Sequence, residues 1–288
     1  MAVEQQLWGS ETSKAVENFP VSGERVPTPV VRWLGRVKAE AARVNAELGL
    51  LDADVAERIA RAGDEVAAGE HDDQFPIDVF QTGSGTSSNM NANEVIANLA
   101  GEGVHANDHV NMGQSSNDVF PSAVHLAAVD ATQNQLLPAL RQLVSSLSRK
   151  SDEFADLVKA GRTHMMDAVP VTLGQELRGY GAQVRLGHAR VGDALARASQ
   201  VPLGGTATGT GLNTHPDFAE GVLRRNAEST PAIATALNPH IGYDRATEIV
   251  NEAAASERTI REVALEKGVD EETLYSALDL RAMARPHG

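Results

Sequence analysis

The longest regular pattern of apolar and polar positions predicts an amphipathic helix near residues 28–48. Apolar side chains recur there at alternating spacings of four and three residues, which is the periodicity of one face of a helix. Gly49 follows directly, as is typical of a helix C-terminus. The apolar positions of this stripe are Val30, Leu34, Val37, Ala41, Val44 and Leu48.

Two more long helices are expected in the middle of the chain. A stripe of leucines and valines predicts one near residues 122–148, in which Pro138 should introduce a bend. The other is expected near residues 171–199, where Thr172 and Gln175 have the spacing of a capping box. With long helical patterns and few, short strand signals, the sequence predicts a mainly α fold.

Shorter elements are expected on either side of these helices. Asp52 is a good N-cap for a second early helix. Residues 75–80 are compatible with a short strand or an extended arm, and Pro76 argues against a central strand. Near the end of the chain, residues 244–256 suit a short helix, and acidic residues from Asp270 onward suit the first turn of a last one.

Three polar segments, each leading into a helix, are candidate ligand-binding loops. They comprise residues 83–94, 107–118 and 161–176. In the last of them, Thr163 and His164 are expected just outside a helix N-terminus, where free N–H groups and a partial positive charge favour a carboxylate. A histidine placed there can transfer protons near neutral pH. Each segment taken alone is also compatible with an ordinary capped loop.

Composition narrows the classes of function. The chain has 288 residues, of which 42% are hydrophobic and 22% charged, as in an ordinary folded protein. Its net charge of -14 argues against nucleic acid and anionic membranes as partners. The absence of cysteine excludes disulfides, thiolate metal sites and thiol nucleophiles. Without a signal sequence or an apolar spanning segment, we expect a cytoplasmic protein.

Together, residues 83–94, 110–121 and 161–176 resemble class II fumarases of the fumarase/aspartase superfamily. Residues 204–213 and 237–244 are similar to further stretches of that family, so the resemblance covers nearly the whole chain. Residues 115–117 and 163–167 resemble fumarase, whereas an aspartase would more typically carry Ser-Thr-Asn in the first stretch and Gln in the second. The resemblance implies reversible addition of water to fumarate giving (S)-malate, with no cofactor and no metal.

The resemblance also implies an incomplete long-helix bundle with small helical N- and C-terminal domains. We expect domains at residues 1–120, 121–222 and 223–288. The family's mobile-loop motif Gly-Ser-Ser-x-Met-Pro-x-Lys-x-Asn and three long helices have no counterpart in this chain. We place the junction that replaces them between about Phe218 and Leu223.

Site residues follow from the resemblance position by position. His164 falls on the family's catalytic histidine, whereas its catalytic serine lies on the absent loop. Asp167 is a poor candidate for the carboxylate that orients His164, because it lies so close in the chain. The substrate-binding positions are Ser84, Gly85, Thr86, Ser115, Ser116, Asn117 and Thr163, and those of a second, non-catalytic dicarboxylate site are His105, Ala106, Asn107 and Asp108.

The expected partners are a small dicarboxylate substrate and further copies of the chain. The family is tetrameric, with each active site built from three subunits around a core of long helices. Removing three of five helices would expose apolar stripes, so we expect association. The alternative functions are a non-catalytic deletion form, which binds dicarboxylates or joins full-length subunits, and an aspartate ammonia-lyase.

Overall fold

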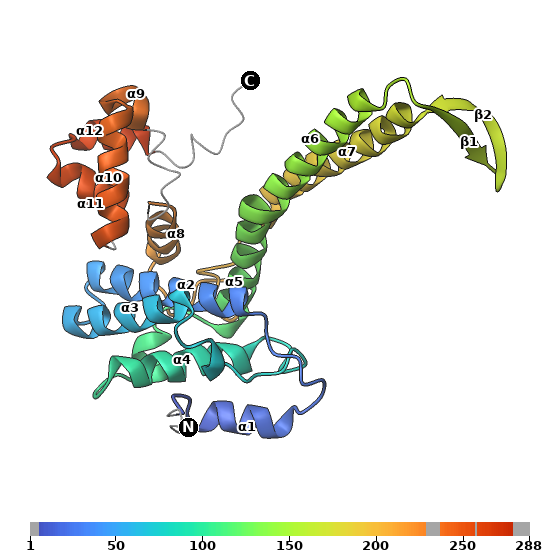
Figure 1. The fold of residues 1–288 in the computed structure, drawn as a ribbon. Helices are drawn as coiled ribbons and strands as arrows, with labels where there is room; N and C mark the ends of the chain where they lie inside the picture. The colour runs from blue at the N-terminus through green and yellow to red at the C-terminus, as the bar shows by residue number, and fades with distance from the viewer. Residues whose placement is uncertain (1–5, 229–236, 257, 279–288) are drawn as a thin grey trace, which may run out of the picture. The chain divides into compact units, whose positions relative to one another are not determined.

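The structure, a computed structural model, describes residues 6–228, 237–256 and 258–278. The chain divides into two units, which are described separately below (Figure 1). Unit 1 combines Met1–Phe120 with Pro202–Gly288, and unit 2 is Pro121–Val201. The expected division into three domains stays a prediction. Helices dominate both units, which confirms the mainly α fold class.

Unit 1 is built on helix α2, which fills the position predicted from the apolar stripe. α2 contacts α3, α4, α8 and the π-helical turn η2. Residues 75–80 form an extended arm, where Asp78 makes an isolated bridge with Arg25. The elements of the first segment of unit 1 are α1 Ser10–Asn18, α2 Thr28–Glu47, α3 Ala53–Ala68, the 3₁₀ turn η1 Asp72–Gln74, α4 Thr86–Ala100, η2 Ala106–Val110 and the start of α5 Ser116–Ala131.

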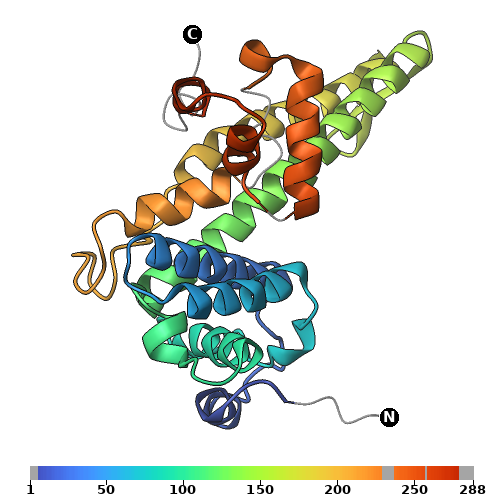
Figure 2. The same ribbon diagram turned by 90° about the vertical axis from the view of Figure 1, so that its left-hand side faces the viewer.

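Helices α2 and α3 approach closely because two glycines face each other. A Cβ atom added to Gly35 would lie 2.8 Å from the carbonyl oxygen of Gly63, and one added to Gly63 would lie 2.8 Å from the oxygen of Gly35. The two helices lie side by side in Figure 2. Backbone therefore packs on backbone, with no room for a side chain at either position.

Helix α8, Phe218–Glu228, runs without interruption through the expected junction. Phe218 and Val222 are completely buried. Arg225 donates hydrogen bonds from Nε to Glu40 (2.7 Å) and from Nη1 to Glu47 (2.6 Å), both on α2. The second segment of unit 1 is thereby fixed to α2 by an apolar contact and by a partly buried ion-pair group.

The last helices of unit 1 share an apolar core of their own. α10 Tyr243–Ser256 confirms the helix expected near 244–256, and α12 Glu271–Ala277 has Asp270 as its N-cap. α11 Ile260–Glu266 opens with a capping box, and α9 is Asn238–Ile241. The core consists of Leu237, Ala246, Ile249, Ala253, Ile260, Val263, Ala264, Val269, Leu274, Ala277 and Leu278.

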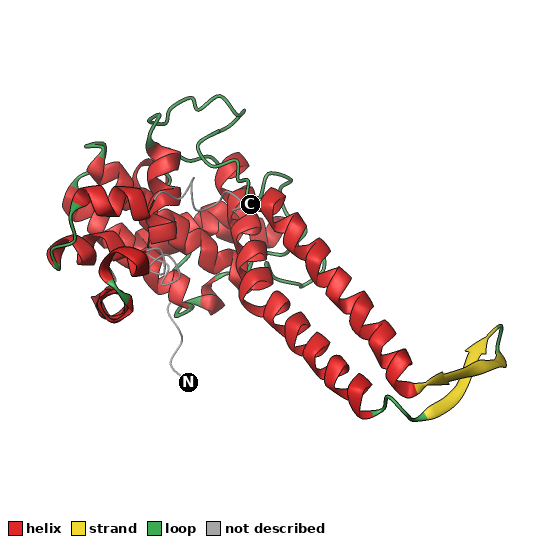
Figure 3. Cartoon of the chain, turned by 90° about the horizontal axis from the view of Figure 1, so that it is seen from above, coloured by secondary structure: helices red, strands yellow, loops and turns green. Residues whose placement is uncertain are grey.

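Unit 2 is a pair of long helices joined by a two-stranded hairpin (Figure 3). α5, which begins in unit 1, continues into the π-helical turn η3 Thr132–Leu136 and then into α6 Leu137–Glu153. The irregular turn falls directly before Pro138, where a missing N–H interrupts the helical hydrogen bonds. α7 Leu173–Ala198 confirms the predicted third helix and its capping box between Thr172 and Gln175.

The segment before α7 differs from the predicted loop. β1 Val158–Thr163 and β2 Met166–Thr172 pair antiparallel, with Thr163 opposite Met166. The two residues between them, His164 and Met165, have φ of 52° and 59°, so they occupy the left-handed region that a two-residue type I′ turn requires. β-branched residues along both strands favour this extended pairing over a loop.

We predict that Gly35→Ala destabilises unit 1. Overpacking against a backbone oxygen costs about 1–3 kcal/mol, which exceeds the gain in helix propensity of about 1 kcal/mol. Chemical denaturation followed by Trp fluorescence reports on unit 1, because Trp8 and Trp33 both lie in it. The control is Gly192→Ala in α7, where an added Cβ meets no atom within 4 Å. An unchanged midpoint for Gly35→Ala would refute the close packing.

Candidate functional site

The first candidate loop is short and is fixed by Gly85. This residue has φ 71° at the N-cap of α4, and a Cβ there would lie 2.2 Å from the ring of Phe120. Only glycine therefore fits. On either side, the exposed hydroxyls of Ser84 and Thr86 lie 2.7 Å apart. The turn thus presents two hydroxyl groups to solvent at the start of a helix.

The remainder of that predicted loop is helical. Asn89, Asn91 and Asn93 are buried in α4, where they were expected to lie in a ligand-binding loop. Glu94 receives hydrogen bonds from the N–H groups of Gly9, Glu11 and Thr12, each at 3.0 Å, so its carboxylate caps α1. The second half of the predicted loop is therefore part of a helix, whose asparagines lie inside the protein and whose Glu94 holds α1.

The second candidate loop is held by Asp118. Its buried carboxylate accepts hydrogen bonds from the backbone N–H groups of Ser115 and Thr206, each at 2.8 Å. The Asn117 side chain donates to the carbonyl of Ala207 at 2.8 Å. This loop also enters its helix earlier than predicted, because α5 begins at Ser116. The serine loop and the glycine-rich segment after residue 203 therefore form one structure within unit 1.

The two hydroxyl-bearing loops are linked by a side chain of α4. Asn89 Nδ2 donates to Ser116 Oγ at 3.0 Å and to Asn111 Oδ1 at 3.1 Å. Asn89 lies about one helical turn after Thr86, the first residue of α4. The buried Asn89 amide thus connects α4, which follows the first loop, to Ser116 of the second loop.

Lys38, which the sequence analysis did not single out, lies directly beneath this site. Its side chain is 0% exposed, and Nζ donates to Gln114 Oε1 at 3.2 Å and to Asn111 Oδ1 at 3.4 Å. Burial lowers the pKa of the Lys38 ammonium to about 7, against the opposing effect of the Asp118 carboxylate. The sequence does carry a signal for this buried lysine, because Lys38 lies four residues after Leu34 and therefore on the apolar face of the predicted helix.

Thr163 and His164 belong to unit 2 and are exposed on the hairpin. The prediction that they lie just outside a helix N-terminus is wrong, because the whole of β2 separates the hairpin turn from α7. His164 makes no hydrogen bond or ion pair with any residue that the structure describes. Asp167 instead lies 3.3 Å from Arg162 Nε. The catalytic assignment of His164 stays a prediction.

The residues of the predicted second dicarboxylate site lie together on one exposed turn. His105 is the N-cap of η2, which contains Ala106, Asn107 and Asp108. His105 Nδ1 accepts a hydrogen bond from the Asp108 N–H at 3.2 Å and lies 3.1 Å from its carboxylate. The turn is therefore ordered by its own side chains. Its role as a binding site stays a prediction.

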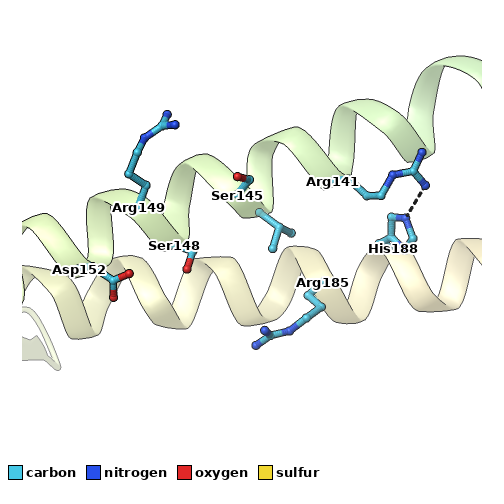
Figure 4. A pocket seen from close by; sticks show the side chains of 8 residues that line it. Arg141, Ser145, Ser148, Arg149, Asp152, Arg185 and His188 are labelled. Atoms are coloured by element: carbon cyan, nitrogen blue, oxygen red, sulfur yellow. Dashed lines mark hydrogen bonds between the residues drawn. The ribbon is translucent and has the colours of Figure 1, made fainter.

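Other polar groups lie apart from these predicted residues. A groove of about 720 Å³ between α6 and α7 is lined mainly by polar and basic side chains (Figure 4). Arg141 and His188 point toward each other across it, with 3.4 Å between Nη1 and Nε2.

Among the described residues, Glu65, Glu70 and His71 are close enough to share a metal ion. No helix among the residues that the structure describes is long and apolar enough to cross a bilayer.

A comparison with models of protein families shows the family to which the chain belongs. The sequence model of a family described as "Lyase" matches residues 2–259. This match covers most of the chain, and the chain belongs to that lyase family.

Among its relatives are class II fumarate hydratases. That of Corynebacterium glutamicum is 56% identical over 220 residues, which is 75% of this chain and 46% of the relative. That of Halobacterium salinarum is 52% identical over 253 residues, which is 85% of this chain and 54% of the relative. The chain thus spans about half the length of the curated relatives it matches.

Solved structures share the fold. A fumarate lyase:delta crystallin from Brucella melitensis, bound to cobalt, matches with a TM-score of 0.71 and 30% identity, over 98% of this chain and 96% of that one. A class II fumarase from Schistosoma mansoni matches with a TM-score of 0.73 over 100% of this chain and 97% of that one, and at 24% identity it bears on the fold alone.

Proposed function

We propose that this chain is a form of fumarate hydratase that binds fumarate and malate and takes part in their interconversion. The observation that carries the proposal is the pair of adjacent hydroxyl groups of Ser84 and Thr86 at the start of α4, together with the Ser116 hydroxyl that Asn89 of α4 holds. They occur in a chain 56% identical to a class II fumarate hydratase over 220 residues. Because the chain spans about half of such relatives, its own activity is the point to be tested.

The chemistry asks for neutral hydrogen-bond donors around a dianion. Hydration of fumarate requires recognition of two carboxylates and stabilisation of the extra negative charge that develops on one of them. Hydroxyl and backbone N–H groups donate to both without adding net charge. In this proposal the substrate contacts of unit 1 come from Ser84, Gly85, Thr86, Ser115, Ser116 and Asn117. Thr163, on the hairpin of unit 2, is assigned to substrate binding by resemblance.

The proton-transfer group in this proposal is His164. His164 is exposed on the hairpin, and imidazole is the side chain that most often serves in general acid–base catalysis. Since no described side chain orients the ring, a partner surface must do so during catalysis. We assign His105, Asn107 and Asp108 to a second dicarboxylate site on the same basis of resemblance.

If the chain hydrates fumarate, His164→Asn should lower kcat by roughly 10²–10⁴-fold, the range for a lost acid–base group. Asparagine keeps one hydrogen-bonding group but does not titrate, so substrate affinity should change far less. Malate dehydration is followed by the absorbance of fumarate. The matched control is His188→Asn, a change at a histidine in the interior of α7. An equal rate in the wild type and His164→Asn would point to a contaminating host enzyme.

We also propose that the chain forms a homo-oligomer through unit 2. The buried residues of α6 are Leu137 and Ser151, and those of α7 are Gly174 and Gly181, so the helix pair has almost no core of its own. The side chains of Leu143 and Leu186 are 46% and 60% exposed. Apolar surface of this kind is typical of an interface between subunits.

Light scattering at micromolar concentration should therefore detect a species larger than one chain. Leu186→Glu should reduce its fraction, because a carboxylate would be buried at the interface. Ala194→Glu, at another exposed position of α7, serves as the control for added charge. A monodisperse monomer that unfolds cooperatively would contradict the proposed assembly.

A non-catalytic form is the second candidate, favoured by the missing counterpart of the family's mobile serine loop. Such a chain would bind dicarboxylates, or join full-length subunits, without turnover. Saturable fumarate binding without malate formation would distinguish it from the enzyme. An aspartate ammonia-lyase is disfavoured by Ser116 and Met166, and release of ammonia from aspartate would identify it.

A further inference from the structure

A partly buried chain of hydrogen bonds leads from Lys38 to the hydroxyl group of Ser116. Lys38 Nζ donates to Asn111 Oδ1 at 3.4 Å, and Asn89 Nδ2 donates to the same oxygen at 3.1 Å. The Asn89 amide nitrogen also donates to Ser116 Oγ at 3.0 Å. Four side chains are thus connected in one network: Lys38 of α2, Asn111 directly after η2, Asn89 of α4 and Ser116 of α5.

The direction of these hydrogen bonds is fixed from the lysine end. An ammonium group can only donate, so Asn111 must turn its amide oxygen toward Lys38. The Asn111 amide nitrogen then faces the carbonyl of Gln114, at 3.3 Å. With Asn111 Oδ1 in place as an acceptor, Asn89 presents its nitrogen, and Ser116 Oγ accepts. The O–H of Ser116 is left to donate to a ligand.

A carboxylate is the ligand that suits this arrangement. An ionised carboxylate only accepts hydrogen bonds, so a hydroxyl whose oxygen already accepts a bond is preset as its donor. Reversing the Asn89 amide would turn its oxygen toward Ser116, and the Ser116 hydroxyl would then donate its hydrogen bond to Asn89 and not to a ligand. Asn89 Oδ1 is buried and has no partner among the described residues, so the two donor bonds of Nδ2 alone hold the amide in place.

Charge reinforces the geometry. Lys38 is completely buried in a chain of net charge -14, and the charged group that acts on it is the Asp118 carboxylate, which also holds the N–H groups of Ser115 and Thr206. A buried cation next to the serine loop offsets part of the repulsion that a dianion meets. Because solvent does not screen it, its effect at the loop is larger than that of a surface lysine.

We propose that Lys38 is a positioning residue of the dicarboxylate site, which sets the Asn111 and Asn89 amides so that the Ser116 hydroxyl donates to a substrate carboxylate. This inference rests on the proposed function, since the ligand is the dicarboxylate assigned there. Lys38 does not contact the ligand in this scheme and acts through the two amides.

The first test needs no ligand. The chain has only four other lysines, Lys14, Lys150, Lys159 and Lys267, so ¹³Cε signals can resolve Lys38. Its titration should have a midpoint near pH 7, and the side-chain amide signals of Asn89 and Asn111 should titrate with the same midpoint. Amide signals that stay constant over this range would overturn the proposed coupling.

The same titration predicts the pH dependence of stability. The pKa of Lys38 is lowered in the folded chain, so the unfolded chain binds more protons between about pH 7 and the usual lysine pKa of about 10.4. The free energy of unfolding contributed by this group therefore rises with pH across that window and is lost as pH falls. Lys38→Met should remove this rise.

The second test is fumarate binding by calorimetry to the full chain. Lys38→Met cannot donate to Asn111, so the Kd for fumarate should increase by roughly 10-fold or more. Lys14→Met is the matched control, because it removes the same charge at an exposed position that pairs with Glu11, and it should change the Kd less than about 2-fold. Wild-type affinity should also weaken from pH 6 to pH 9, whereas that of Lys38→Met should not.

A second variant keeps the test decisive if Lys38→Met does not fold. Asn89→Asp has the same shape but can only accept hydrogen bonds, so the Ser116 hydroxyl should donate to it and not to fumarate, and fumarate binding should weaken similarly. Wild-type-like binding by a folded Lys38→Met or by Asn89→Asp would overturn the positioning role while leaving the proposed function intact. No fumarate binding by the wild-type chain would overturn both.

Discussion

A lysine amine buried beneath the candidate site is the constraint on which the arrangement of unit 1 depends. Removing an ammonium group from water is costly unless acceptors replace the lost hydration. Here Asn111 and Gln114 provide oxygens, and Asp118 provides a compensating charge. All three belong to residues 111–118, the stretch that carries the candidate serines. The contacts that replace the hydration of Lys38 therefore also fix the conformation of the serine loop.

Helix α2, which carries Lys38, connects the serine loop to the rest of unit 1. On one side, Gly35 allows α3 to approach to backbone contact. On another, Glu40 and Glu47 pair with Arg225 and hold α8. Lys38 lies between these positions in the sequence, so the packing that keeps α2 rigid also fixes the origin of the hydrogen-bond network. Unit 2 is organised differently, because its hairpin and helix pair leave the candidate His164 and several large apolar side chains exposed. We propose that association with further copies of the chain covers these apolar side chains.

The sequence predicted the regular parts of this structure well, for reasons visible in single residues. The stripe from Val30 to Leu48 defines α2, and Thr172 with Gln175 marks the start of α7. The hairpin was missed because its turn is His164-Met165 and not the Asn-Gly or Asp-Gly pair that usually signals a type I′ turn. Asn89 was predicted to lie in a loop because polarity alone cannot distinguish a solvated amide from a buried one. Lys38 was missed because its meaning depends on Asn111 and Gln114, which lie more than 70 residues away.

The central claim is that the hydroxyl-bearing loops of unit 1 are preorganised to bind a dicarboxylate. The most direct measurement is a fumarate titration followed by the backbone ¹H–¹⁵N signals of the intact chain. We predict saturable shifts at residues 84–86 and 115–117, with the signals of α12 unchanged. A titration in which those two loops do not respond, or respond no more than α12 does, would contradict the central claim.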